Sequence, residues 1–148
     1  LHTEDTVSAV FRMIEMGVPP YLLAATLSGV IAQRLVRRVC PHCCEEYEVA
    51  RDAHEAIQLG DLYHEEIRLK RGRGCAHCHG SGYRGRMAIH EVLSITERMR
   101  AAILGASDQA SLRAAAAADH VETLWQDGVT KALAGDTTLA EVGRALYG

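Results

Sequence analysis

The chain has 148 residues, 48% of them hydrophobic, which suits one domain with a buried core or a part of a larger protein. Its formal net charge of −3 and its 5% aromatic content argue against a dedicated nucleic-acid binder, which is usually basic and offers aromatic stacking platforms. No stretch approaches the roughly 20 apolar residues of a membrane span, and no signal peptide opens the chain.

The N-terminal part of the chain predicts two helices and a strand. Apolar residues recur with helical spacing over residues 7–14, with Thr3 as the expected N-cap and Gly17 as the expected end. The pair "PP" then predicts the start of a second helix with "YLLAATLSGV" (21–30) as its body. The β-branched segment "IAQRLVRRV" (31–39) predicts a strand that leads into a cysteine loop.

The middle of the chain is charged and weakly patterned. The segment "EEYEVARDAHEAIQLGDL" (45–62) predicts no more than a short helix, and "EEIRLKRGRG" (65–74) predicts a short strand that runs into a turn. The apolar, branched segment "MAIHEVLSI" (87–95) predicts a second longer strand.

The last third of the chain predicts four short helices, over residues 96–104, 108–118, 122–135 and 139–147. Asp108 is the expected N-cap of the second of these helices. Thr138 and Glu141 have the spacing of a capping box at the start of the last one. The sequence therefore predicts an α/β fold class, with an all-helical subdomain at its C-terminal end.

Four of the five cysteines form two CxxC pairs, "CPHC" and "CAHC". Each pair presents two thiolates from one tight turn, and together they match the tetrahedral four-sulfur shell of a structural Zn²⁺. The predicted ligands are Cys40, Cys43, Cys75 and Cys78. The gap between the two pairs exceeds the usual spacing of simple zinc ribbons, which indicates a longer insert. Four protein ligands leave no open position, so we expect a structural role without hydrolytic chemistry.

Two other uses of these cysteines fit the pattern less well. A thioredoxin-like redox site needs one CxxC pair in a βαβ context, which the pattern lacks, and iron–sulfur clusters space their cysteines differently. The odd, clustered count does not resemble a secreted disulfide framework and favours a reducing compartment. Cys44 is expected to be a free, partly buried thiol, with an exchange of Cys44 for Cys43 as ligand as the less favoured alternative. Three neighbouring histidines are not expected to be ligands: His42, His77 and His79.

Several arginines lie two to four residues from the expected zinc ligands, namely Arg37, Arg38, Arg71 and Arg73. Four thiolates and one Zn²⁺ carry a charge of −2, so we expect these arginines to compensate the site, with phosphate contact as the competing interpretation. The stretch "CHGSGYRGR" (78–86) adds glycines that permit sharp turns. Its Arg84 and Arg86 are either solvated or available to an anion.

One local stretch, "CAHCHGSG", is similar to the cysteine-rich repeat of J-domain co-chaperones, but "CPHCCEEY" lacks the glycines of such a repeat. A broader resemblance covers nearly the whole chain. It is carried by "LHTEDT", "QRLVRRVCPHC", "GCAHCHGSGYRGRMAIHEVL" and "TLWQDGVTKALAGDTTLAEV", in that order. With these four motifs in this order, the sequence resembles the C-terminal portion of the secretion ATPases of type II secretion and type IV pilus assembly. The resemblance implies the end of a RecA-like, hexameric P-loop ATPase domain with a tetracysteine zinc insert and a C-terminal helical subdomain.

The resemblance also implies roles for individual residues. His2 matches the last histidine of the family's His box, which lies near the nucleotide phosphates. Arg86, and less closely Arg84, match arginines that support nucleotide hydrolysis and subunit contact. Residues 33–35, Gln33, Arg34 and Leu35, match a "QRL" stretch with a structural role. The four CxxC cysteines match the family's zinc ligands.

This sequence departs from the family pattern at three places. Glu4 stands where Asn is usual, Met87 and Ala88 replace Thr-Gly, and "HVETL" (120–124) replaces Gly-Met-x-Thr-Leu. The first two departures lie close to the expected active-site residues and leave room for a divergent or less active member.

No GxxxxGK[ST] motif occurs, since neither lysine follows a glycine, so the chain alone is not expected to hydrolyse ATP. Because residue 1 is Leu rather than Met, we expect a fragment whose nucleotide loop, with ATP and Mg²⁺, lies upstream. The expected organisation is a tail of the ATPase core over 1–39, a zinc-binding insert over 40–78, a return strand over 79–95 and a helical subdomain over 96–148.

The resemblance implies a cytoplasmic homo-hexamer that is peripheral to the inner membrane through secretion or pilus platform proteins, with no nucleic-acid partner. The alternative from another class is a stand-alone, non-enzymatic zinc-binding module for a protein or nucleic-acid partner.

Overall fold

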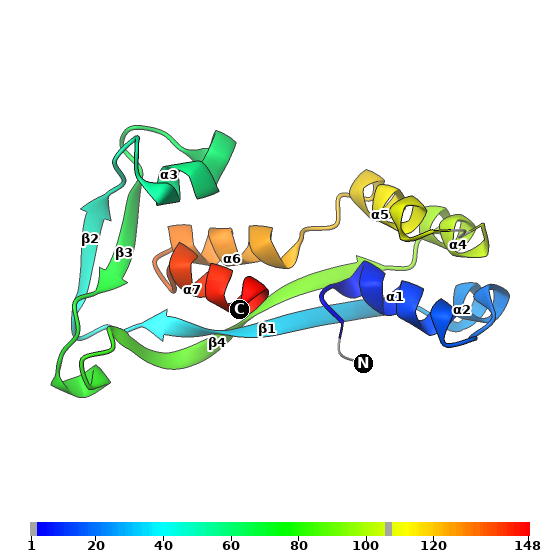
Figure 1. Ribbon diagram of the computed structural model, residues 1–148, viewed down its shortest axis with the longest axis horizontal. Helices are drawn as coiled ribbons and strands as arrows, with labels where there is room; N and C mark the ends of the chain where they lie inside the picture. Colours follow the sequence, from blue (N-terminus) through cyan, green and yellow to red (C-terminus); the bar gives the residue numbers. More distant parts are fainter. Residues whose placement is uncertain (1–2, 106–107) are drawn as a thin grey trace. The chain divides into compact units, whose positions relative to one another are not determined.

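The computed structural model describes residues 3–105 and 108–148 (Figure 1). The chain divides into two compact units, which are described separately below. The first unit comprises the residues up to Gln33 together with His90–Leu124, and the second comprises Arg34–Ile89 and Trp125–Gly148. Helices and strands are mixed along the chain, as expected for an α/β domain. No helix in the described ranges combines the length and the apolar character needed to cross a bilayer.

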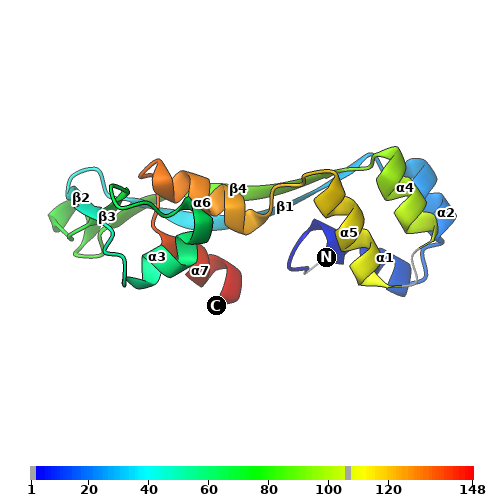
Figure 2. The same cartoon turned by 90° about the horizontal axis from the view of Figure 1, so that it is seen from above.

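The first unit is built from α1 (Thr6–Glu15), α2 (Pro20–Thr26), α4 (Glu97–Leu104) and α5 (Gln109–Ala118). Figures 1 and 2 show α1 beside α5 and α2 beside α4, and α4 also contacts α5. Their apolar faces close on a core whose fully buried members include Val10, Leu93, Met99, Ile103 and Leu112. The helical periodicity that predicted these elements therefore reflects one shared core.

Side-chain caps fix where α1, α4 and α5 begin. Thr96 accepts a hydrogen bond from the Met99 N–H at 3.1 Å, and Asp108 accepts one from the Ser111 N–H at 2.8 Å, which confirms Asp108 as a cap. The prediction of Thr3 as the cap of α1 is wrong. Asp5 is the N-cap, and its carboxylate accepts from Ser8 N–H at 2.7 Å.

The second helix is shorter than the sequence predicted. It begins at Pro20 as expected but ends at Thr26, because Leu27 is already extended, with φ −76° and ψ 126°. The next carbonyl, of Ser28, accepts from the Ile95 N–H at 3.1 Å. Strand pairing therefore takes over the last residues of the segment that was predicted to be helical.

The two long strands are β1 (Gly29–Val39) and β4 (Tyr83–Ser94), which pair in a two-stranded sheet. The bond from Ile95 to Ser28 in the first unit and one from Cys40 N–H to the Gly82 carbonyl (2.9 Å) in the second make the pair antiparallel. Both strands were predicted. β4 begins earlier than expected, because its pairing continues through the glycine–arginine stretch.

The second unit also contains β2 (Cys44–Glu48), α3 (His54–Leu59), the 3-10 turns η1 (Gly60–Leu62) and η2 (Ala76–Cys78), β3 (Arg68–Gly72) and α7 (Leu139–Tyr147). It contains α6 (Leu124–Leu133) as well, except for the first residue of that helix. Its core includes Val49, Ile67, Leu69, Val129, Ala132 and Leu139. This core is separate from that of the first unit.

The sequence did not predict β2, which pairs antiparallel with β3. Three glutamates of β2 face basic residues of β3 in the ladder, as Glu45 with Arg71, Glu46 with Lys70 and Glu48 with Arg68. The corresponding N–O distances are 2.9, 3.7 and 2.9 Å. Opposite charges directly across a strand pair stabilise it, which explains how the polar stretch "EEYE" forms a strand.

Only half of the predicted capping box at α7 forms. Thr138 accepts from the Glu141 N–H at 3.1 Å, as predicted. The Glu141 carboxylate accepts instead from Arg37 and Arg144, because these two guanidinium groups reach it at 2.6 Å each.

Candidate metal centre

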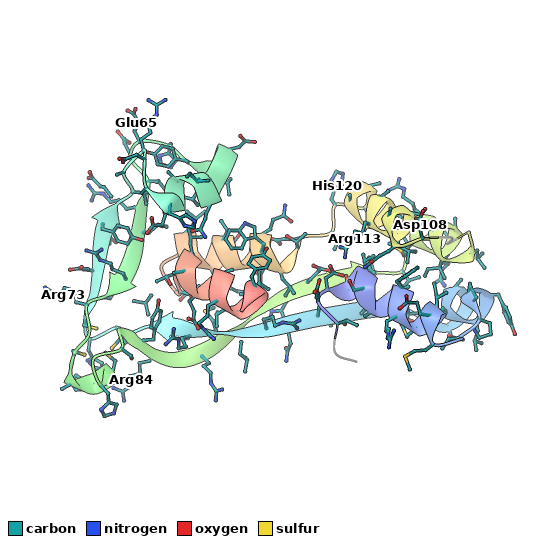
Figure 3. The ribbon with its side chains drawn as sticks, in the orientation of Figure 1. Glu65, Arg73, Arg84, Asp108, Arg113 and His120 are labelled. Atoms are coloured by element: carbon teal, nitrogen blue, oxygen red, sulfur yellow. The ribbon has the colours of Figure 1, made fainter. Side chains whose placement is uncertain are left out.

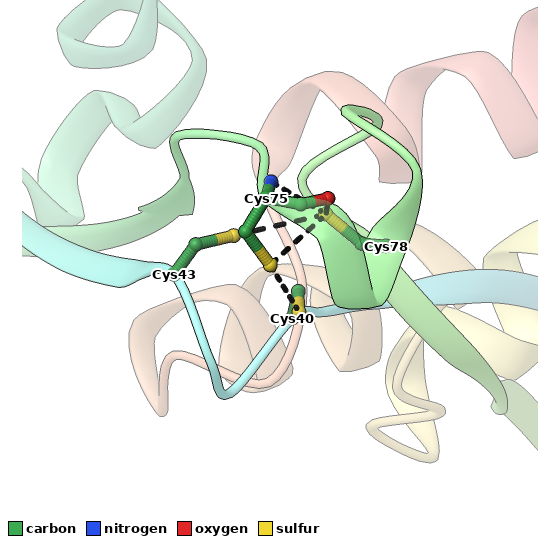
Figure 4. A group of neighbouring side chains, drawn as sticks. All are labelled: Cys40, Cys43, Cys75 and Cys78. Atoms are coloured by element: carbon green, nitrogen blue, oxygen red, sulfur yellow. Dashed lines mark hydrogen bonds between the residues drawn. The ribbon is translucent and has the colours of Figure 1, made fainter.

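The four CxxC cysteines come together in the second unit (Figure 4). Their Sγ atoms all lie within 4.8 Å of one another, and three separations measure 3.7, 3.8 and 3.9 Å. A tetrahedral shell with Zn–S bonds of about 2.3 Å places its sulfurs about 3.8 Å apart. The four cysteines are therefore positioned to bind one metal ion, and their spacing fits zinc.

Two strands and one short turn position the ligands. Cys40 follows β1 and Cys43 precedes β2, while Cys75 directly precedes η2 and Cys78 is its last residue. Three of the four side chains are buried, and Cys75 is half-buried. The two pairs come from segments that lie far apart in the chain, so a shared ion would cross-link them.

The surroundings of Cys43 and Cys78 shift the pKa values of the two thiols in opposite directions. Burial raises the pKa of the Cys43 thiol to about 12. Burial also opposes ionisation of Cys78, but the N–H groups of Cys75 and Gly82 each donate to its Sγ at 3.2 Å and lower its pKa to about 6. A divalent cation at the centre of the four sulfurs would favour the thiolate form of all of them.

We call the two CxxC turns the first knuckle (residues 40–43) and the second knuckle (residues 75–78). The glycines around the second knuckle are required by close backbone contacts. A Cβ on Gly72 would lie 2.0 Å from the Gly82 carbonyl oxygen, and one on Gly74 would lie 2.6 Å from that of Gly80. Gly74 and Gly80 flank the second knuckle, and Gly72 and Gly82 flank that pair. The backbone segments before and after the knuckle are therefore in close contact. The glycines thus serve the metal centre, and no anion is needed to explain them.

The histidines and the fifth cysteine lie outside the group of candidate ligands. The rings of His42 and His77, which hold the same place in the two CxHC turns, stack with centroids 4.0 Å apart. His79 follows Cys78 with a φ of 51°. Cys44 is free, as predicted, but it is exposed rather than partly buried, because it begins β2, where exposed and half-buried positions alternate.

The arginines near the knuckles pair with carboxylates, which the sequence-based interpretation did not include. Arg37 lies 2.6 Å from Glu141 and Arg38 lies 3.2 Å from Asp136. Arg71 and Arg73 both contact Glu45, at 2.9 and 3.2 Å. Arg73 is labelled in Figure 3. All four arginines are therefore paired with carboxylates, so their positive charge does not act on the cysteine thiolates alone.

The remaining predicted site residues are placed as follows. Arg84 (labelled in Figure 3) and Arg86 are exposed at the start of β4. Neither forms an ion pair with any residue in the described ranges. His2 lies outside the described residues. The "QRL" stretch lies in β1, where Arg34 is half-buried and Leu35 is exposed.

Two buried carboxylates were missed by the sequence reasoning. Glu141 is 1% exposed and Glu91 is 5% exposed. For Glu91 a signal existed, because period-two alternation in β4 places it on the same strand face as the fully buried Ile89 and Leu93. For Glu141 the capping-box pattern pointed to another partner, since Arg37 lies 104 residues away in the chain.

Known proteins similar to this chain are bacterial secretion and pilus components. The model of the family "Type II/IV secretion system protein" matches residues 1–144. The chain is 42% identical, over 96% of its length, to the type IV pilus assembly ATPase PilB of Thermus thermophilus. It is 41% identical to a putative type II secretion system protein E of Escherichia coli and 38% identical to type II secretion system protein E of Aeromonas hydrophila, each over 97% of the chain.

These matches cover nearly all of the chain and identify its class: the chain belongs to the type II/IV secretion system protein family. These matches confirm the resemblance to secretion and pilus-assembly proteins that the sequence motifs indicated. The chain spans 16% of the length of the pilus relative, and 29% and 28% of the two type II secretion relatives.

Proposed function

We propose that this chain is the C-terminal part of an ATPase that powers type II secretion or type IV pilus assembly. The observation that carries the proposal is identity of about 40% over almost the whole chain to proteins of these two systems, one of them named as an assembly ATPase. The chain holds no phosphate-binding GxxxxGK[ST] motif. ATP and Mg²⁺ would therefore bind residues upstream of Leu1, in a RecA-like core that assembles as a hexamer.

The contribution of this chain to that machine is structural and catalytic. Cys40, Cys43, Cys75 and Cys78 would hold a structural Zn²⁺ within an insert over residues 40–78. The bound ion would supply a cross-link between the two knuckles and no open position for a substrate. The core would continue through 1–39 and 79–95, with a helical subdomain over 96–148, and the protein would work in the cytoplasm on inner-membrane platform proteins.

Arg86 and Arg84 would stabilise charge on the transferring phosphoryl group or at the contact between neighbouring subunits, and His2 would lie near the phosphates. The exposure of both arginines and their lack of an ion pair with any described residue support this role, because an arginine held by a carboxylate is less available to a nucleotide.

The proposal is tested by measuring ATP turnover of the complete polypeptide. We expect Arg86→Ala to lower kcat about a hundredfold, with a smaller loss for Arg84→Ala, because a fixed cation near the developing charge is removed. Arg51→Ala is the matched control, since Arg51 is also exposed and without an ion pair among the described residues. Parental turnover in Arg86→Ala, or an equal loss in Arg51→Ala, would overturn the assignment.

A further inference from the structure

Gly82 connects the four-cysteine centre to the strand that carries the two exposed arginines. Its N–H donates to the Cys78 Sγ at 3.2 Å, and its carbonyl accepts from the Cys40 N–H at 2.9 Å. Cys40 and Cys78 belong to different knuckles, and both are buried. The peptide groups on the two sides of Gly82 are therefore each held by a candidate metal ligand.

Ser81 closes the turn between Cys78 and Gly82. The Ser81 N–H and the Ser81 hydroxyl both donate to the Cys78 carbonyl, at 3.1 and 2.7 Å. The backbone of Gly82 also lies against another segment, because a Cβ on Gly82 would lie 2.5 Å from the Gly72 carbonyl oxygen. These contacts hold Gly82 closely in place relative to the two cysteines.

Arg84 and Arg86 follow this turn directly. β4 begins at Tyr83, so the two arginines lie only two and four residues beyond Gly82. Both side chains are exposed, and Arg84 is labelled in Figure 3. Because no carboxylate in the described ranges pairs with either guanidinium group, their positions depend on the backbone at the start of β4.

A bound ion would fix the two cysteines that hold Gly82. Across the two knuckles the sulfurs lie 3.8 and 3.9 Å apart in two pairs (Figure 4). An ion shared by the four sulfurs would cross-link the knuckles, and few apolar side chains besides the cysteines lie there to replace it. We therefore expect the position of Gly82 to depend on whether the ion is bound.

We propose that the four-cysteine centre positions Arg84 and Arg86 through Gly82. This inference rests on the proposed function, which places the two arginines at the transferring phosphoryl group or at the contact between subunits. A displacement at the start of β4 moves both guanidinium groups, and a misplacement of about 1 Å can slow a reaction about a hundredfold. Loss of the ion would then slow ATP turnover as well as loosen the insert.

The test uses the complete polypeptide with zinc bound, after a zinc-selective chelator at unchanged Mg²⁺, and as the variant Gly82→Ala. A Cβ on Gly82 pushes this residue away from Gly72 but leaves the four cysteines in place. We expect Gly82→Ala to retain one zinc per chain and to lower kcat for ATP about tenfold, with little change in KM. Chelation should lower kcat at least as much. In both cases hydrogen exchange of the amides of residues 83–86 should rise at least about tenfold.

The same changes in a variant that carries both Arg84→Ala and Arg86→Ala separate positioning from other effects of the metal. If the centre acts through the arginines, neither Gly82→Ala nor chelation slows this variant further. Gly60→Ala is the matched control, because Gly60 also has a positive φ, of 54°, but its Cβ would meet no described heavy atom within 4 Å. It should keep the parental kcat and the parental exchange of residues 83–86.

Three results would overturn the inference. In the first, Gly82→Ala and the chelated protein keep the parental kcat, so that other contacts hold β4, such as that of the Tyr83 hydroxyl, 2.8 Å from the Thr138 hydroxyl. In the second, the losses multiply with those of the arginine variant, so that the metal acts elsewhere. Both results leave the proposed function intact.

In the third result, the arginine variant turns over ATP at the parental rate, which removes the role of the arginines from the proposed function as well. If Gly82→Ala folds poorly, the chelated parent and the chelated arginine variant decide between these results.

Discussion

At the scale of single residues, Glu141 shows how a buried charge can stabilise the second unit. Its side chain is fully buried, and it accepts from the Arg37 N–H at 3.0 Å and from the guanidinium groups of Arg37 and Arg144. Arg37 also lies over the ring of Tyr83 at 4.3 Å, and the Tyr83 hydroxyl is 2.8 Å from that of Thr138. Removing the carboxylate would leave two arginines facing each other, which makes this contact costly to break.

The ionisation of Glu141 predicts a loss of stability in acid. Burial opposes its ionisation, but the hydrogen bonds from Arg144 and Arg37 outweigh it and lower the pKa from 4.5 to about 2. The stabilisation is therefore complete above about pH 4.5 and is lost as the pH falls toward 2. We expect a loss of about 2 kcal/mol, below the full linkage value because both arginines are partly exposed to solvent. Chemical denaturation followed between pH 6 and pH 2 measures it.

A pair of variants checks that Glu141 causes this pH dependence. Glu141→Gln should be less stable than the parent at pH 6, and its stability should depend less on pH between 4.5 and 2. Glu15→Gln removes an exposed carboxylate that lies 3.2 Å from Arg12 and should follow the parental curve. Equal slopes for the parent and Glu141→Gln would contradict the prediction.

His120 stands at one of the positions where this sequence departs from the family pattern, and its backbone conformation is one that favours glycine. It follows α5 with a φ of 55°, in the left-handed region that favours glycine, and the resemblance has Gly at this position. The His120 N–H donates to the Ala117 carbonyl at 3.0 Å, and the Val121 N–H donates to that of Ala116 at 3.1 Å. These two bonds define a Schellman ending, whose C′ residue is usually glycine.

This geometry predicts that His120→Gly stabilises the protein. We expect a gain of about 0.5–1 kcal/mol, because glycine relieves the strain of the left-handed backbone but is also freer in the unfolded chain. The measurement is the free energy of unfolding from urea denaturation. Ala118→Gly, placed inside the same helix end, should instead lose about 0.5–1 kcal/mol. A loss of stability in both variants would show that the histidine side chain contributes more than its backbone strain costs.

At the scale of secondary-structure elements, features that depend on neighbouring residues could be predicted from the sequence, whereas contacts with residues far along the chain could not. Asp108 and Pro20 were predictable because a cap or a first-turn proline acts close to the start of its own helix. β2 was not predictable, because its glutamates form a strand only opposite the basic residues of β3, which follow much later in the chain. In the same way, the two CxxC pairs predicted a metal site, but no local pattern predicted that Glu91 would accept a hydrogen bond from Thr6.

The same distinction applies to the glycines of the second knuckle. The sequence indicated sharp turns but left open whether they served an anion. Only the close approach of Gly72 to Gly82 shows that two backbone segments meet there. Contacts of this kind depend on how the loop returns on itself, which no periodicity or composition encodes.

At the scale of the whole molecule, the two compact units have separate cores, so loss of the metal should act on one of them. The first unit is closed around residues such as Leu93 and Met99, whereas the second contains the cysteine cluster beside a small core around Leu69. The knuckles carry few apolar side chains besides the cysteines. A structural zinc therefore contributes free energy of folding there that little else in the segment can replace.

We expect metal analysis of the purified protein to give one zinc per chain, and Cys40→Ser or a strong chelator to release it. Hydrogen exchange should then rise at least about tenfold for amides within residues 40–48 and 68–82, while amides of the first unit keep their protection. Cys44→Ser is the matched control, because it removes the exposed neighbouring thiol and leaves the four ligands in place. Unchanged protection in Cys40→Ser would mean that the glycine contacts and the β2–β3 ladder hold the knuckles without metal. Equal loss of protection in the first unit would mean that the two cores unfold together, so that the zinc stabilises the whole chain rather than its insert.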